Sequence, residues 1–236
     1  MPQAPPRRVG ERLLRLLPPV RRSLDQVPVY AEAWERANEQ VLRSPPGTAP
    51  LWVVLGDSTA QAVGTAGIEH GYVARVRRLL ERRDGADWQV LNLSRSGAVV
   101  ADVLGVQLPR LAELGAAGVR PRLVSAVVGG NDLRRTPLPE LLHRLGQLVE
   151  ALPPGALVAT LPRGLKEDKA RVANALLRER AAARGLLLAD LWARTGPPWR
   201  GKFADGLHPN AVGLTDWVQA VREALGLPPE EPLPAR

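Results

Sequence analysis

A glycine, an acid and a serine directly follow a short apolar run near residue 50. The run is Leu51 to Leu55, and the tripeptide is Gly56, Asp57 and Ser58. One explanation is a strand-to-helix turn, in which the glycine permits the turn and a polar side chain caps the next helix. Another is a serine nucleophile held at the carboxyl edge of a sheet. The tripeptide alone fits both explanations, so the other polar clusters must decide.

A histidine near the C-terminus supplies the base that a serine nucleophile requires. Serine is a weak nucleophile until a base removes its proton, and a histidine such as His208 can do this near neutral pH. The second ring nitrogen needs an acceptor, which Asp205 in the segment DGLHPN can provide by folding back over three residues. A metal site built on this pair lacks a third ligand at a sensible spacing. We therefore expect an acid–base pair and no metal.

Two further clusters offer hydrogen-bond donors for the oxyanion of an acyl transfer. Gly97, in NLSRSG, allows close approach to its backbone N–H, and Asn131, in GGND, carries a side-chain amide. The backbone N–H of Ser58 is a third donor, and losing one such donor costs about 10²- to 10³-fold in rate. The alternatives are that Gly97 only permits a turn and that Asn131 only caps a helix.

From residue 51 onward, apolar runs alternate with segments of helical period. The predicted strands are residues 51–56, 88–93, 122–129, 156–161 and 186–192. The predicted helices are residues 71–83, 101–117, 138–151, 166–184 and 211–225. This alternation predicts an α/β fold with a five-stranded parallel sheet covered on both faces. Because ligands of such sheets lie beyond the carboxyl ends of the strands, we expect all four polar clusters on one rim.

The four clusters resemble the sequence blocks of the SGNH, or GDSL-type, hydrolases, in the order of that family and over about residues 51–225. The resemblance implies a flavodoxin-like three-layer αβα sandwich and hydrolysis of a small acyl ester or thioester without a cofactor. The site residues that it implies are Ser58 as nucleophile, Asp205 and His208 as the remaining triad, and Gly97 and Asn131 in the oxyanion hole with the Ser58 N–H. The sequence departs from the family at Thr59, where leucine is usual, and we expect this to affect the acyl pocket rather than the chemistry.

Length and composition restrict the remaining possibilities. A chain of 236 residues can bury one sizeable core, and the absence of cysteine excludes disulfides and thiolate catalysis. The net charge of +8 comes almost entirely from arginine. It favours, as an alternative function, a non-catalytic basic module that binds nucleic acid or anionic lipid. We consider nucleic acid an unlikely partner because the arginines are scattered among acidic residues.

The N-terminal part lies outside the family resemblance. Residues 7–22 could form a basic amphipathic helix on an anionic membrane, or an arm packed on the domain. Val29 to Arg43 is predicted to be a helix, followed by a Pro/Gly linker. With no stretch of about 18 apolar residues and no signal-peptide cleavage site, we expect a cytoplasmic protein. The expected organisation is a basic helical extension (1–50), a hydrolase domain (51–227) and a Pro-rich tail (228–236), in an unknown oligomeric state.

Overall fold

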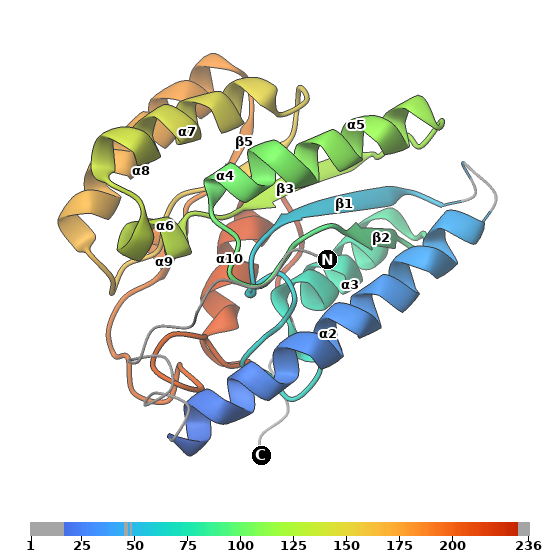
Figure 1. Cartoon of the computed structure of the whole chain (residues 1–236). Coiled ribbons are helices and arrows are strands. Elements are labelled where there is room, and N and C mark those ends of the chain that lie inside the picture. The colour runs from blue at the N-terminus through green and yellow to red at the C-terminus, as the bar shows by residue number, and fades with distance from the viewer. Residues whose placement is uncertain (1–16, 45–46, 48, 231–236) are drawn as a thin grey trace, which may run out of the picture.

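A computed structural model describes residues 17–44, 47 and 49–230, and its centre is a five-stranded parallel sheet (Figure 1). The strands are β1 (Leu51–Gly56), β2 (Gln89–Asn92), β3 (Leu123–Val127), β4 (Leu157–Ala159) and β5 (Leu187–Ala189). Their order in the sheet is β2-β1-β3-β4-β5, and every neighbouring pair is parallel. The predicted α/β class and flavodoxin-like topology are therefore confirmed.

Helices connect the strands along the described part of the chain. They are α2 (Pro18–Arg43), η1 (Ile68–His70), α3 (Tyr72–Asp84), α4 (Val100–Asp102), η2 (Val103–Gln107), α5 (Leu108–Ala116), α6 (Gly130–Arg135), α7 (Leu138–Ala151), α8 (Glu167–Ala183), α9 (Leu191–Arg194) and α10 (Leu214–Ala224). The predicted helix 101–117 is interrupted by η2, a π-helical turn. The predicted strand 186–192 is too long, because the Asp190 side chain accepts a hydrogen bond from the Ala193 N–H and starts α9.

The strands direct alternate side chains to two separate cores, as a pleated sheet requires. Val53 and Leu55 pack under α4, α5, α7 and α8, whereas Trp52 and Val54 pack against α2, α3 and α10. Figure 1 shows these two helical layers on opposite faces of the sheet. Both faces of the central strands are consequently buried, and β1 (51–56) and β3 are buried at every position.

The N-terminal extension differs from its prediction in one respect. Instead of a helix that starts at Val29, α2 runs without interruption from Pro18 to Arg43, and Pro28 lies inside it. Pro18 and Pro19 occupy the first turn, where a backbone N–H has no hydrogen-bond acceptor within the helix. The cost of Pro28 is offset by the docked face of α2, which buries Tyr30 and Trp34. Residues 7–16 of the predicted basic arm lie outside the described residues, and no described helix is long and apolar enough to span a bilayer.

The residues after α10 return to the first half of the chain. Arg75 of α3 is 1% exposed, and its guanidinium donates to both carboxylate oxygens of Glu230, at 2.7 and 2.6 Å. The same guanidinium bonds the Ala211 carbonyl and the Thr215 hydroxyl. The fully buried charge is thus paired and hydrogen-bonded, which burial of an ion requires.

Candidate active site

The loop after β1 and the loop after β3 meet at the point where the strand order reverses. Ser58 follows β1, Asn131 is the second residue of α6 after β3, and these two strands are neighbours in the sheet. This is the position at which open α/β sheets bind ligands. A third segment, between α9 and α10, brings His208 to the same rim. Ser58, Asn131 and His208 line one cavity of about 390 Å³.

His208 and Asp205 contact each other through their side chains. The His208 Nδ1 lies 2.7 Å from Asp205 Oδ2, and Asp205 Oδ1 accepts the backbone N–H groups of Leu207 and His208. Burial raises the pKa of Asp205, but the hydrogen bonds from His208 and Leu207 outweigh it and hold the pKa well below its usual range. The carboxylate therefore stays ionised and fixes the imidazole with its Nε2 free for other contacts.

A narrow ribbon holds the His208 segment in place. Phe203 and Pro209 form an antiparallel bridge, the Ala204 N–H donates to the His208 carbonyl, and the Asn210 N–H donates to the Lys202 carbonyl. Because the backbone is bonded on both sides of the ring, a loop without regular secondary structure can present His208 in a fixed place.

The Ser58 turn is bonded to its surroundings by backbone and side-chain groups. Asp57 Oδ1 accepts from the N–H and the hydroxyl of Thr59, and the Val63 N–H donates to the Ser58 carbonyl. Burial raises the pKa of Asp57 above its usual value, because it outweighs the lowering effect of the hydrogen bonds from Thr59. Asp57 thus holds the turn through these two bonds. Thr59, the departure from the family pattern, lines the cavity.

Gly97 and Asn131 are brought to the same side of the site. Asn131 Nδ2 donates to the Ala98 carbonyl at 3.0 Å, and Arg135 donates to the Gly97 carbonyl at 2.8 Å. Gly97 has a φ of +81°, which favours glycine. Asn131 lines the cavity, whereas Gly97 is not among its lining residues.

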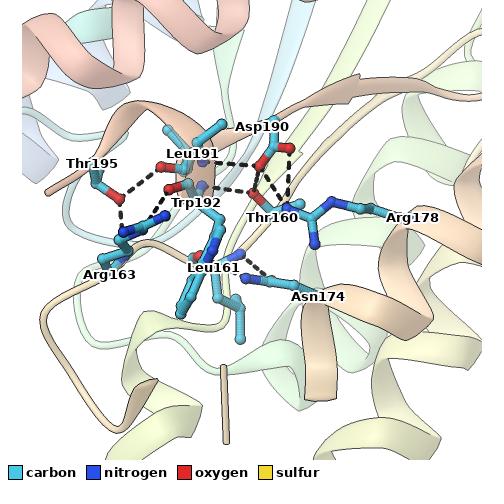
Figure 2. Close-up of polar contacts among 10 residues, drawn as sticks. Thr160, Leu161, Arg163, Asn174, Arg178, Asp190, Leu191, Trp192 and Thr195 are labelled. Atoms are coloured by element: carbon cyan, nitrogen blue, oxygen red, sulfur yellow. Dashed lines mark hydrogen bonds and ion pairs between the residues drawn. The ribbon is translucent and has the colours of Figure 1, made fainter. Parts of the chain in front are cut away.

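The cavity wall away from Ser58 is largely apolar and aromatic. Its members are Leu133, Leu165, Leu191, Trp199, Phe203 and Trp217. Figure 2 shows the polar network around Leu191, one of these residues. The Thr160 hydroxyl donates to Asp190 and accepts the Trp192 N–H, and Arg178 pairs with Asp190 at 3.0 Å. Sequence reasoning missed this wall because its residues come from five separate segments.

Two buried glutamines at the site were also missed. Gln107, in the π-helical turn, accepts the Gly56 N–H at 2.8 Å and donates to the Gly56 carbonyl at 2.9 Å. Gln61, three residues after Ser58, donates to the Ser94 carbonyl and accepts the N–H and hydroxyl of Ser96. The available signal was the position of Gln61 inside GDSTAQ and of Gln107 in an apolar helical run.

Several other polar residues are not among those that line the cavity. His70 and His143 are exposed. Arg95 and Arg134 are exposed, and neither is among the residues that line the cavity. Asp132 is buried and accepts the Val100 N–H and the Thr136 hydroxyl, so it ties α6 to the start of α4.

Comparison with known families agrees with this geometry. The model of the GDSL-like lipase/acylhydrolase family matches residues 54–214, which is more than half of the chain. The chain belongs to this family. The match contains Ser58, Gly97, Asn131, Asp205 and His208, whereas α2 lies outside it. Among curated proteins, no relative matches this chain.

Several solved structures share the fold of this chain. The acetylxylan esterase Axe2 from Geobacillus stearothermophilus is 22% identical with a TM-score of 0.60, over 77% of this chain and 95% of that one. TesA is 26% identical with a TM-score of 0.59, over 74% and 97% of the two chains. The lipase/acylhydrolase from Enterococcus faecalis is 21% identical with a TM-score of 0.58, over 78% and 100%.

Proposed function

We propose that this GDSL-family protein is a cofactor-independent serine ester hydrolase whose nucleophile is Ser58. The observation that carries the proposal is the His208–Asp205 pair at 2.7 Å on a cavity that Ser58 also lines. A nucleophile, a base and a third group that orients the base are the parts that acyl transfer requires. Family membership supports the same class of reaction.

In the proposed reaction, His208 accepts the proton of Ser58 while the serine oxygen attacks the ester carbonyl. The oxyanion of the tetrahedral intermediate is stabilised by the N–H groups of Ser58 and Gly97 and by the Asn131 amide. His208 then protonates the leaving alcohol or thiol, which leaves an acyl-serine. Water, deprotonated by His208, attacks this acyl group; the ester bond to Ser58 breaks, His208 returns the proton to the serine oxygen, and the acid is released. The ionised Asp205 stabilises the imidazolium at each of these stages.

The wall of the cavity supports a substrate with an apolar acyl or aryl group. Trp199, Phe203 and Trp217 present apolar surface, and burying such surface contributes roughly 25 cal/mol per Å². Two charged side chains at the wall, Lys202 and Asp216, are paired with each other at 2.8 Å. They therefore neutralise each other, and Arg163 is a further charged residue that lines the cavity.

The test is hydrolysis of p-nitrophenyl esters from acetate to palmitate by the wild type, Ser58→Ala and Asp205→Asn. We expect Ser58→Ala to show no hydrolysis above the background rate and Asp205→Asn to lose about 10⁴-fold in kcat. Ser44→Ala, a serine at the C-terminal end of α2, is the matched control and should keep wild-type turnover. Undiminished hydrolysis by folded Ser58→Ala would refute the assignment.

A further inference from the structure

The helix outside the family match makes direct hydrogen bonds to the loop behind the nucleophile. Four side chains of α2, each four residues from the next, lie on one face of the helix, as a helical period requires. They are Gln26, Tyr30, Trp34 and Asn38. Each one bonds to backbone atoms of the residues 61–65 or of the end of β2. This face of α2 therefore carries hydrogen-bonding groups where it contacts the loop and apolar surface between those contacts.

Gln26 makes the most specific of these contacts. Its Nε2 donates to the Thr65 carbonyl at 2.8 Å, and its Oε1 accepts the Gly64 N–H at 2.8 Å. The Tyr30 hydroxyl donates to the same Thr65 carbonyl, also at 2.8 Å. A single amide thus satisfies one donor and one acceptor on consecutive residues, which fixes both the position and the orientation of that piece of backbone.

The segment held by Gln26 lies between the two reacting side chains of the proposed triad. On one side, the Val63 N–H bonds the Ser58 carbonyl at 3.0 Å. On the other side, a Cβ placed on Gly64 would come within 3.0 Å of the His208 Cβ and 2.7 Å of the Pro209 carbonyl oxygen. No side chain separates this segment from the histidine loop, so a displacement of the segment would move both the Ser58 turn and the His208 loop.

We propose that α2 braces the nucleophile loop and that Gln26 is a positioning residue for the reaction. This inference rests on the proposed function of Ser58 and His208. Through Gly64 and Thr65, Gln26 sets the distance between the serine turn and the histidine loop. Because reacting groups must be held within a fraction of an ångström, a displacement of about 1 Å can cost up to about 10²-fold in rate.

The test compares Gln26→Leu with Gln40→Leu, the same substitution at an exposed glutamine of α2 for which the structure gives no side-chain hydrogen bond. For Gln26→Leu we expect kcat on a p-nitrophenyl ester to fall about 10- to 100-fold, with KM within about twofold. The rate at which diethyl p-nitrophenyl phosphate labels Ser58, followed by intact-protein mass, should fall by a similar factor. Gln40→Leu should match the wild type in both measurements.

Two further variants separate positioning from general destabilisation. Val149→Ala removes buried surface from α7, far from the loop, and should lower Tm while leaving kcat unchanged. Tyr30→Phe removes one hydroxyl and should lower kcat by less than Gln26→Leu does, so it serves as the test if Gln26→Leu does not fold. A Gln26→Leu or Tyr30→Phe enzyme with wild-type kcat and labelling rate overturns the brace. A wild type that neither hydrolyses esters nor is labelled refutes the proposed function instead.

Discussion

Replacing Gln107 by methionine tests how far the π-helical turn supports the serine turn. Gln107 is 1% exposed, so methionine can fill its place without adding volume, and only the two bonds to Gly56 are lost. The Gly56 carbonyl keeps a bond from the Arg95 N–H at 3.2 Å, whereas the structure gives no other partner for the Gly56 N–H. The unpaired N–H costs about 1–3 kcal/mol and the other lost bond about 0.5–1.5 kcal/mol.

We therefore expect Gln107→Met to lower the free energy of unfolding by about 2–4 kcal/mol, measured by urea denaturation. Because Gly56 lies two residues before Ser58, kcat on a p-nitrophenyl ester should fall as well. Gln147→Met, at an exposed position of α7, is the control and should change stability by less than about 0.5 kcal/mol. A Gln107→Met protein as stable and as active as this control would show that the two bonds do not hold the turn.

Two further substitutions test the surroundings of the serine. Burial raises the pKa of Asp57 above 3.8, so the folded state binds its proton more tightly than the unfolded chain does and loses stability as pH rises through the raised pKa. Asp57→Asn should therefore gain in stability relative to the wild type between pH 4 and pH 8 in urea titrations, and an unchanged difference would contradict this. Gly64 has a φ of +100°, and a Cβ added to it would lie 2.7 Å from the Pro209 oxygen, whereas a Cβ on Gly85 would meet open space. Gly64→Ala should therefore lose more stability and more kcat than Gly85→Ala. Equal losses in the two variants would exclude the steric contact.

The parts of the site predicted from sequence are those in which chemistry and position are both local. Ser58 directly follows an apolar strand, and Asp205 reaches His208 across three residues, so each arrangement is visible in a short window. The parallel arrangement of the strands follows from the alternation of strands and helices, because parallel strands need crossover connections, whereas the flavodoxin-like topology was implied by the family resemblance. These arrangements can be predicted because residues close together in the sequence determine them.

The missed residues act on backbone groups that are distant in the sequence. Gln107 bonds Gly56 across 51 positions, and Gln26 bonds Thr65 across 39. A glutamine has no fixed partner in sequence, since any exposed N–H can donate to its amide oxygen and any exposed carbonyl can accept from its amide NH₂. The continuous α2 was missed for a related reason. Pro28 indicates a break when taken locally, and only the docked face of the helix, with its buried Trp34, explains why the helix continues.

The ion pair between Arg75 and Glu230 has a consequence for the order of events during synthesis. The two residues are 155 positions apart, and α3, which carries Arg75, packs on α10 near the end of the chain. While the chain is still growing, α3 exists without the helix that covers it and without the carboxylate that neutralises its buried guanidinium. Contacts of such long range slow folding. The first β-α unit therefore reaches its native state only after the last turn of α10 and residue 230 have been made.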